Sequence, residues 1–524
     1  MTATAPYRSP LGTAGRDGFA RLVHAEWTKF RTAPGGPAGL VLAALLVVGL
    51  GLLSAAGSHA SCSKGPVEVP CPVPPRGPGG EAVEDHFFFA HQPLRGDGSI
   101  TVRVSAMSGR IRLPDAVPGV RNVATAMTPW ARAGLMIKAS TRQGASYAAV
   151  MVTAEHGVRM QHDFTEDVAG LPGKVTPSTP RWLRLTRTGD TVTGEESADG
   201  VRWTKVAAVR LPGLPAQARV GLFAASPGDV RVTGNAVGGS TVTSRFSEVT
   251  AVMDRLDVRG AGTGGAFALD DIGVSYELDG SPHHPGGFRE SGGTYTITGV
   301  GDIAPLTVGS TVENTLAGAM FALVAVIVVG VLSVTAEYRR GLVRTTLLAS
   351  PRRGRVLVAK AVVVLAATFA GSLAATAVTL PLAKRVLAGN GVHLLPVSAL
   401  TELRVVAGVA GVLAVSAVLA LAFGALLRRG AAAVIAAVAA VLVPYVLATT
   451  SVLPEPVADW LLRVTPAAGF AVQQSIPEYP QVVGHHAPAG GFYPLPPWAG
   501  FAVLCGYAAL VLALAVRRLN REDA

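Results

Sequence analysis

The sequence of 524 residues predicts a multi-domain membrane protein, an all-α bundle of six transmembrane spans with an all-β antiparallel sandwich inserted after the first span. Three observations lead to this fold class. Long stretches of the chain are apolar, and charged residues make up only 15% of it, against about 25% in an ordinary soluble domain. Residues 58–312 instead alternate apolar and polar residues between turns rich in Gly and Pro. Basic residues gather beside the apolar stretches.

Six stretches are apolar enough to form membrane spans, since a helix needs about 20 apolar residues to cross the hydrocarbon core. They cover residues 39–56, 316–335, 356–380, 405–427, 431–450 and 498–516. The first stretch could also be a cleaved signal peptide, but the long segment before it favours an uncleaved anchor. The spans divide the chain into residues 1–37 before the first span, 38–57 for that span, 58–312 for the insert and 313–524 for the other five spans.

The distribution of Arg and Lys predicts the orientation of the spans. Basic residues cluster before the first span, between the second and third, between the fourth and fifth, and after the sixth. Because cytoplasmic loops carry the excess of Arg and Lys, these segments should face the cytoplasm. Lys384 and Arg385, in an outer loop, are exceptions. We therefore expect a multi-pass plasma-membrane protein with cytoplasmic termini and residues 58–312 outside, which explains the net charge of +11 without a nucleic-acid partner.

The segment before the first span, residues 19–31 (FARLVHAEWTKFR), is predicted to be an amphipathic helix. One helical face carries its large apolar residues, which are Phe19, Leu22, Val23, Trp27 and Phe30. A basic polar face and an interfacial Trp favour a helix that lies in the membrane plane. A helix packed against protein is the alternative.

The insert is predicted to consist of short strands. In residues 99–105 (SITVRVS), Ile100, Val102 and Val104 alternate with polar residues, as in a half-buried strand. Similar runs occupy residues 134–139, 147–153, 182–188, 201–206, 220–225 and 230–233. Short strands separated by Gly, Pro and Asp are typical of an antiparallel sandwich. Residues 293–305 add a strand and a turn that lead to the second span.

Two of the three cysteines lie close together just after the first span. If this segment is outside the cell, Cys62 and Cys71 can form a disulfide that closes a short Pro-rich loop. Two free thiols are the alternative. Cys505 lies in the last span, where a cysteine usually acts as a small buried apolar residue.

Several motifs of the insert resemble the concanavalin A-like lectin/glucanase jelly roll. They are WARAGLMI at residues 130–137, PRWLRL at 180–185, SADGVRW at 197–203 and VGL at 220–222. The resemblance implies a jelly-roll sandwich, and such folds often bind a glycan on their concave face. The candidate residues for a glycan face are Tyr147, His156, Gln161 and His162. Ordinary core or surface positions are the alternative for all four.

No enzymatic or metal site is predicted in the insert. Glycoside hydrolysis needs two carboxylates that face each other across a cleft, and the strands show no such acidic signature. Asp270-Asp271 and His283-His284 lack the ligand spacing of known zinc or calcium sites. Solvated loops explain both pairs.

The segment between the second and third spans, residues 336–360 (AEYRRGLVRTTLLASPRRGRVLVAK), carries the strongest functional signal. From its charge alone it would be an ordinary positive-inside loop with a short amphipathic helix. However, EYRRG at 337–341, RTT at 344–346, PRRGR at 351–355 and Lys360 together resemble the permease subunits of ABC transporters of the type-2 (export) class. DWLLR at 459–463 and TPAAG at 465–469 resemble the outer loop of actinobacterial members.

This resemblance covers residues 19–57 and 313–524, and it implies roles for two groups of residues. The family's loop after the second span holds the coupling helix that docks on a separate ATPase. The matching residues are Glu337, Tyr338, Arg339, Arg340, Gly341, Arg344, Thr345, Arg352, Arg353 and Arg355. Glu26, Trp27 and Lys29 match the elbow helix that precedes the first span. The large insert departs from the minimal family pattern, so the substrate cannot be carried over from the family.

We therefore expect a permease subunit that moves a substrate across the plasma membrane while a separate subunit hydrolyses ATP. The chain has no phosphate loop of the form G-x-x-x-x-G-K-[ST], so it is not predicted to be an enzyme, and ATP hydrolysis is expected in a partner subunit. No cofactor or metal is predicted either. The expected partners are the ATPase, a second permease chain in a homo- or heterodimer, and the lipid bilayer. A membrane-anchored glycan-binding or sensing protein is the alternative, and a membrane-bound glycosidase is a third possibility.

Overall fold

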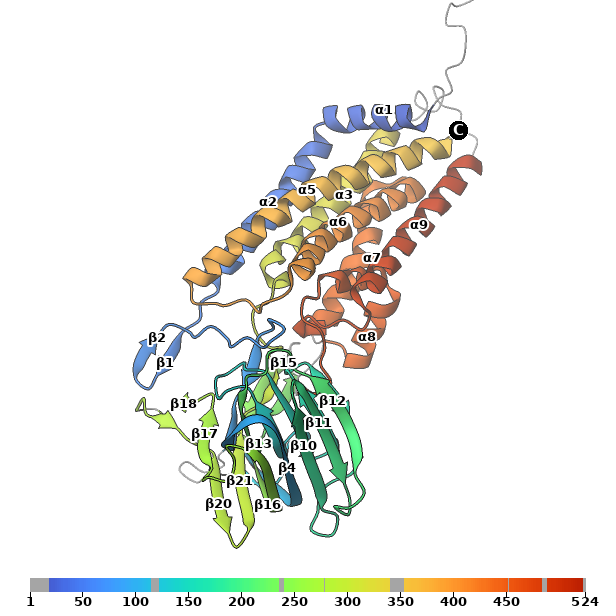
Figure 1. Cartoon of the computed structure of the whole chain (residues 1–524). Helices are drawn as coiled ribbons and strands as arrows, with labels where there is room; N and C mark the ends of the chain where they lie inside the picture. The colour runs from blue at the N-terminus through green and yellow to red at the C-terminus, as the bar shows by residue number, and fades with distance from the viewer. Residues whose placement is uncertain are drawn as a thin grey trace, which may run out of the picture.

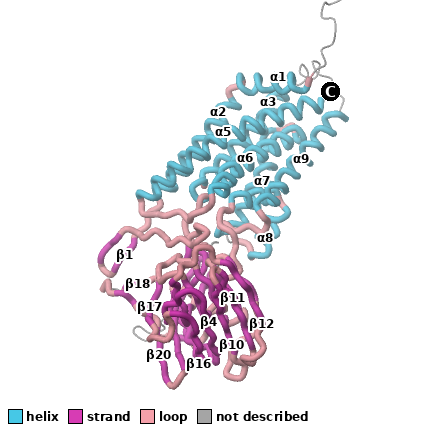
Figure 2. Tube along the Cα trace, in the orientation of Figure 1, coloured by secondary structure: helices cyan, strands magenta, loops and turns pink. Residues whose placement is uncertain are grey.

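The computed structural model describes residues 18–114, 122–234, 240–277, 279–339, 353–450, 452–482 and 488–521. These residues form a bundle of helices with a β domain attached to one end (Figures 1 and 2). The short helix α1 (Phe19–Thr32) and the C-terminal end of α9 (Pro497–Arg521) lie at the opposite end of the bundle. We call this the loop end, because residues 339 and 353, which flank the segment 340–352, also lie there.

Six of the described helices are long and apolar enough to cross a membrane, which confirms the predicted six-span bundle. They are α2 (Gly35–Gly57), α3 (Gly318–Arg339), α5 (Arg353–Gly389), α6 (Ala399–Leu427), α7 (Gly430–Thr449) and α9. Helix α6 is the central one, since 89% of its apolar segment is buried, against 22% for α2 and for α7. Helix α3 approaches α6 closely at Gly330, where a Cβ atom would lie 2.1 Å from the carbonyl oxygen of Ala417. The exposed apolar surfaces of the outer helices suit contact with lipid.

Helix α5 is longer than the predicted third span. Its 37 residues correspond to about 55 Å of helix, against a hydrocarbon core of about 30 Å. The additional turns contain Lys384 and Arg385, and Lys384 forms an ion pair with Glu402 of α6. The two basic exceptions to the predicted orientation therefore lie on a helix rather than in a loop.

Four short helices complete the bundle on the side of the β domain. They are η1 (Glu313–Leu316), α8 (Glu455–Val464), η2 (Pro466–Gln473) and η3 (Pro488–Gly490). The residues of η2 from Pro466 to Val472 are buried, and η2 packs against α6, α7 and α9. A Cβ atom on Gly500 of α9 would lie 2.2 Å from the carbonyl oxygen of Ala468, so only glycine allows this approach.

The main sheet of the β domain has 14 strands, all paired antiparallel. They are β4 (Phe87–Arg112), β5 (Val123–Ala124), β6 (Arg132–Lys138), β7 (Tyr147–Thr153), β8 (Val158–His162), β9 (Glu166–Ala169), β10 (Arg181–Thr188), β11 (Thr191–Ser197), β12 (Thr204–Arg210), β13 (Gln217–Ala225), β16 (Ser247–Ala261), β17 (Ala268–Ile272), β20 (Gly287–Ser291) and β21 (Thr294–Val300). Four two-stranded ladders accompany it. They are β1 (Cys62–Lys64) with β2 (Val67–Val69), β3 (Val83–Asp85) with β22 (Ile303–Pro305), β14 (Asp229–Gly234) with β15 (Ser240–Arg245), and β18 (Ser275–Tyr276) with β19 (Pro282–His283).

Strand β4 joins the two halves of the main sheet. Its residues 88–95 pair with β13, and its residues 98–104 pair with β10. Between them the chain turns at Gly96, whose φ of 68° is readily adopted only by glycine. The sheet therefore folds over on itself, and its two halves enclose a hydrophobic core. That core includes Leu94, Ile100, Val102, Leu135, Val150, Leu183, Leu222, Val249 and Ile297.

Each of the seven predicted strand segments overlaps a strand of the structure, but β6 and β7 are buried on both faces rather than half-buried. The reason is a second apolar cluster that covers the other side of this half of the sheet. It contains Phe87, Phe89, Met136, Tyr147, Phe164, Phe223 and Ile303. Local alternation of residue types could not show this second layer, because its members come from distant parts of the chain.

Two buried ion pairs lie on the same side of the sheet, one at each end of β6. Lys138 Nζ donates to Asp85 Oδ2 at 2.7 Å, and both side chains are fully buried. Burial lowers the pKa of the Lys138 amine, and the carboxylate of Asp85 opposes that effect. At the other end of β6, Arg132 pairs with Asp302 and donates to Gln161 Oε1 at 2.8 Å. Asp85 and Asp302 belong to the segments that connect the domain to α2 and α3, so these pairs fasten both connections.

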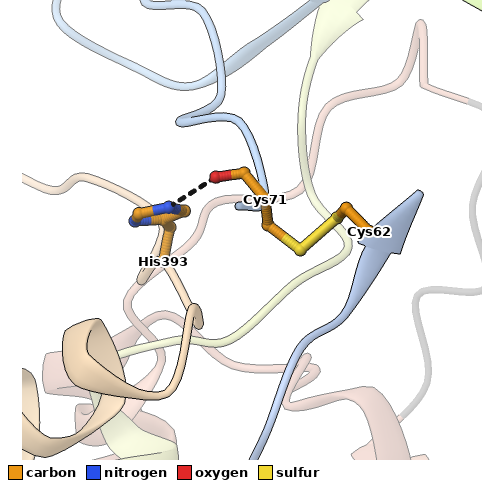
Figure 3. Close-up of a disulfide and its surroundings, with 3 residues drawn as sticks. All are labelled: Cys62, Cys71 and His393. Carbon is orange, nitrogen blue, oxygen red and sulfur yellow. Dashed lines mark hydrogen bonds between the residues drawn. A yellow bond between two sulfur atoms is a disulfide. The ribbon is translucent and has the colours of Figure 1, made fainter. Parts of the chain in front are cut away.

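A disulfide joins Cys62 and Cys71, whose Cα atoms are 5.0 Å apart (Figure 3). The loop it closes is tied to the helices, because His393 Nε2 donates to the carbonyl oxygen of Cys71 at 3.1 Å. On another side of the domain, Gln481 Nε2 donates to the carbonyl oxygens of Phe164 and Thr165 at 3.3 and 3.0 Å. The β domain thus contacts the bundle at several points besides its two covalent connections.

Replacing Lys138 by Met should destabilise the protein by about 3–5 kcal/mol, because Asp85 would remain buried without a partner charge. The matched control is Lys174→Met, which removes an exposed pair with Glu155 and should cost less than about 1 kcal/mol. Chemical unfolding of the purified full-length protein measures both. The double variant Lys138→Met/Asp85→Leu should regain part of the loss. Equal effects of the two single substitutions would contradict a structural role for the buried pair.

Candidate functional site

Helix α1 packs against the loop end of the bundle through one side only. The residues on that side are Glu26, which is buried, and Leu22, Val23, Lys29 and Phe30, which are half-buried. Phe30 packs on the hydrophobic core of the bundle. Trp27 and Phe19 point away from the protein, with about two-fifths of each side chain exposed. An amphipathic helix with exposed aromatic residues on one side suits a position at the surface of a bilayer.

Four charged residues from three helices meet where α1 crosses the ends of α3 and α5. Lys360 Nζ of α5 lies 2.6 Å from Glu26 Oε2 of α1 and 2.9 Å from Glu337 Oε1 of α3. Lys29 Nζ of α1 lies 2.7 Å from Glu26 Oε1 and 3.6 Å from Glu337 Oε1. The positive and negative charges alternate and balance. We call these four residues the ion cluster.

Most of the ion cluster is shielded from solvent. The side chains of Glu26, Lys360 and Glu337 are 4%, 9% and 19% exposed, whereas Lys29 is 43% exposed. Burial alone would raise the pKa of Glu26, but Lys360 and Lys29 outweigh it and hold the pKa of this carboxyl below its ordinary value. Burial alone would lower the pKa of the Lys29 amine, but the carboxylates of Glu26 and Glu337 outweigh it and raise this pKa above its ordinary value. Glu26 and Lys29 are therefore held in their charged forms, and removing one member of the cluster leaves its partners without a balancing charge.

Other contacts join the remaining helices at the loop end. The guanidinium of Arg428, between α6 and α7, lies 5.5 Å from the ring centre of Tyr338. Arg518 of α9 donates from Nη1 to the carbonyl oxygen of Leu426 at 2.8 Å. A Cβ atom on Gly354 would meet Val516 at 2.8 Å, so the start of α5 lies against α9. The two helices that flank the segment 340–352 are thus connected to α1, α6 and α9.

The structure brings together some of the residues that the sequence assigns to ATPase coupling. Of the predicted set, Glu337 belongs to the ion cluster and Tyr338 to the contact with Arg428. Arg339, Arg353 and Arg355 lie at the adjoining ends of α3 and α5. Arg340, Gly341, Arg344, Thr345 and Arg352 lie outside the described residues.

The structure also adds a residue to the site. Of the predicted elbow-helix residues, Glu26 and Lys29 join the ion cluster, and Trp27 stacks on Phe30 with 6.3 Å between ring centres. Lys360, the centre of the cluster, belongs to the loop sequence that resembles the permeases, but it is not among the residues predicted for ATPase coupling. A single Lys within the apolar run VLVAKAVVV was the signal for it, since charges inside spans are rare and usually paired.

The candidate glycan residues do not form an open surface. Tyr147 and Gln161 are fully buried, Tyr147 against the ring of Phe164 and Gln161 against Arg132. His162 is half-buried, and His156 is exposed and stacks on Trp130 with 4.1 Å between ring centres. The side chains of Tyr147 and Gln161 are therefore not accessible to a sugar.

The pairs Asp270-Asp271 and His283-His284 of the β domain bond to separate partners and do not converge on one point. His283 pairs with Glu277, and His284 Nδ1 lies 3.2 Å from Asp271 Oδ2. Asp270 Oδ2 lies 2.7 Å from His91 Nε2. Within the described part of the chain, no three His, Cys, Asp or Glu side chains come together as metal ligands.

Replacing Lys360 by Met should destabilise the purified protein by about 3–5 kcal/mol, because Glu26 and Glu337 would share a buried site with only Lys29 to balance them. Lys384→Met provides a control on the same helix, since its pair with Glu402 is about one-third exposed on both sides. That control should cost about 1 kcal/mol or less. Chemical unfolding in detergent measures the stability of both variants. An equal loss of stability in the two would show that the ion cluster stabilises the protein no more than an exposed ion pair does.

Three solved structures show remote similarity to part of this chain. Scytalido-glutamic peptidase with a transition state analog inhibitor is 8% identical, covers 43% of this chain and 100% of its own, and gives a TM-score of 0.26. SCP-B, a peptidase of the Eqolisin family in complex with the tripeptide Ala-Ile-His, is 8% identical, covers 43% of this chain and 100% of its own, and gives a TM-score of 0.25. A functionally unknown protein from Saccharomyces cerevisiae is 13% identical, covers 32% of this chain and 72% of its own, and gives a TM-score of 0.20.

The comparison with protein families gives a match over most of the chain. No curated protein matches it. Residues 38–524, which include all six spans and the inserted β domain, match the model of a family described as ABC-2 family transporter protein. The match confirms the class of membrane permease that the loop sequence indicates. This chain therefore belongs to the ABC-2 transporter family, as a multi-pass membrane permease of an ABC transporter.

Proposed function

We propose that this permease transmits the work of a separate ATPase subunit from the loop 336–360 to the membrane helices. The observation that supports this role is the ion cluster. Within the loop 336–360, Glu337 lies in the last turn of α3 and Lys360 lies in the first turns of α5, on either side of the segment 340–352. Their ion pair of 2.9 Å closes the base of the loop. Force applied to the loop is thus applied to α3 and α5 together.

The same cluster extends this coupling to the N-terminal helix. Glu26 accepts hydrogen bonds from both Lys360 and Lys29, so α1 is held to the base of the loop by a buried contact. Displacement of the loop by the ATPase should therefore move α1, α3 and α5 as one unit. Rigid-body movement of packed helices is a common way for proteins to switch between two arrangements. The Arg residues of the loop suit a docking surface, since Arg is enriched in protein interfaces.

We also propose that the loop end faces the cytoplasm and the β domain lies outside. Basic residues at the loop end support this orientation, and they include Arg339, Arg353, Arg355, Arg428, Arg429, Arg517, Arg518 and Arg521. The disulfide beside the β domain supports it as well, because disulfides persist in oxidising compartments. In this orientation both termini and the loop 336–360 are accessible to a cytoplasmic ATPase.

The outer domain is proposed to be a jelly-roll sandwich of the concanavalin A-like type. Two halves of an antiparallel sheet that enclose one core, with β4 shared between them, support this assignment. We further propose that the permease acts with a second permease chain, as the loop resemblance implies. No contact of the described residues favours the alternative of a glycan-binding sensor over the transport function.

The proposed orientation predicts which introduced thiols an impermeant reagent can reach. In a Cys505→Ser background, Val201→Cys on the β domain should react with a membrane-impermeant maleimide in intact cells. Val201 is 79% exposed, so the site is accessible whenever it is outside. Arg521→Cys, at the loop end, should react only after the membrane is permeabilised. The reverse pattern would mean that the protein is inserted the other way round.

The proposed docking loop predicts a loss of ATPase binding when its charge is reversed. The variant Arg344→Glu/Arg353→Glu should no longer co-purify with the subunit that carries the phosphate loop, which mass spectrometry identifies in the wild-type preparation. The control Arg202→Glu/Arg259→Glu makes the same charge change on the exposed surface of the β domain and should retain the partner. An ATPase that binds all three proteins equally would locate docking elsewhere, and its absence from all preparations would contradict the coupling role.

A further inference from the structure

A cavity of about 1470 Å³ lies between the β domain and the bundle. Its walls come from η1 and the start of α3, from the middle of α6, from the end of α7, from η2, and from β14 and β22. Ligand pockets usually occupy about 300–1,000 Å³, so this cavity has room for a sizeable molecule. None of the sites described above accounts for it.

The wall on the side of the bundle is apolar. It includes Leu316 and Met320 of the α3 region, Val412 and Leu413 of α6, and Phe470 and Val472 of η2. Apart from Met320, these side chains also belong to the buried core of the bundle, so the wall is a fixed surface. A molecule against it would need an apolar body to replace water there.

A belt of polar groups crosses the cavity beside this wall. Gln473 Nε2 donates to the hydroxyl oxygen of Tyr493 at 2.6 Å. The hydroxyl of Tyr445 lies 3.5 Å from both groups, and its ring lies against Phe470 with 4.2 Å between ring centres. The belt holds α7, η2 and the segment before α9 in fixed positions, so the cavity is preformed rather than created by a ligand.

The charged residues of the cavity are all acidic. Among the lining residues that the structure describes, these are Glu84, Asp302 and Glu313, and none of the lining residues is Lys, Arg or His. Asp302 is neutralised by Arg132. Desolvation in the cavity wall, together with repulsion from Asp302, raises the pKa of Glu84 to about 7. This leaves Glu313 as the carboxylate best suited to hold a cation, in a chain whose net charge is +11.

Glu313 has an acceptor that no described group satisfies. Its Oε1 accepts from the backbone N–H of Ser475 at 3.3 Å, but its Oε2 is buried without a hydrogen-bond partner. Arg404 attracts Glu313 electrostatically, yet Nη2 of Arg404 donates to the carbonyl oxygen of Gln474 at 2.5 Å. A buried carboxylate oxygen without a donor is costly, and a charged N–H donor removes that cost.

We propose that this cavity binds an amphipathic cation, with its ammonium group on Glu313 and its apolar body along the wall formed by α3, α6 and η2. The position between the spans and the outer domain makes such a molecule the substrate class of the permease. This last step rests on the proposed transport function, whereas the binding itself does not depend on it.

Binding of a fluorescent amine tests the proposal directly. The probe is dansylcadaverine, an apolar dansyl group on a chain that ends in a primary ammonium, and its N-acetyl derivative is the uncharged match. The full-length protein is placed in phosphatidylcholine nanodiscs, and the signal of empty nanodiscs is subtracted. We expect the ammonium probe to bind at least about tenfold more tightly than the acetylated one, since a hydrogen bond to a charged group is worth that much. Equal affinities would overturn the proposal.

Variants then locate the site. Glu313→Gln should abolish the preference for the ammonium probe, whereas Glu455→Gln, an exposed carboxylate outside the cavity, should leave it unchanged. Met320→Trp should fill the apolar wall and weaken both probes. If Glu313→Gln still prefers the ammonium probe over the acetylated probe, the assignment of the ammonium group to Glu313 is wrong. If that variant fails to fold, the comparison of the two probes on the wild-type protein tests the proposal. The binding assay contains no ATPase, so it is independent of the co-purification experiment. Selective binding of the ammonium probe without ATPase co-purification would contradict only the transport function. ATPase co-purification without selective binding would contradict only the proposed cation site.

Discussion

A charge buried away from water is stable only when a partner charge balances it, and both the loop end of the bundle and the β domain at its other end depend on that constraint. At the loop end, Lys360 lies between Glu26 and Glu337 and so connects three helices. At the other end, Lys138 and Arg132 occupy the two ends of β6 and pair with Asp85 and Asp302. These carboxylates belong to the segments that leave α2 and lead to α3. The first two spans therefore have charge-balanced anchors on both sides of the membrane segment.

Much of the architecture could be predicted from the sequence, because its signals are local. Runs of about 20 apolar residues predicted the six spans, and alternating residues predicted strands that the structure contains. Contacts between distant residues could not be predicted in this way. Glu26 and Lys360 are 334 positions apart, and no periodicity connects them. Tyr147 and Gln161 looked available to a ligand because the layer that buries them, including Phe164 and Ile303, is formed by other segments.

The β domain and the bundle share the large cavity, so the insert is a structural part of the permease. β14 and β22 line the cavity together with α3, α6 and α7. Gln481 binds two carbonyl groups of the domain, and His393 binds the disulfide loop. A molecule in this cavity would contact both the bundle and the β domain.

The pairing of β3 with β22 has a consequence for how such a protein can arise. These two strands carry the chain into and out of the β domain, and they lie side by side, with Asp85 opposite Ile303. Neighbouring strands are about 5 Å apart, so the whole domain occupies the width of a single hairpin in the connection between α2 and α3. An ancestral permease with a short connection there could acquire the domain in one genetic insertion without separating its first two spans. Modular gain and loss of outer domains at this point is therefore geometrically simple for this architecture.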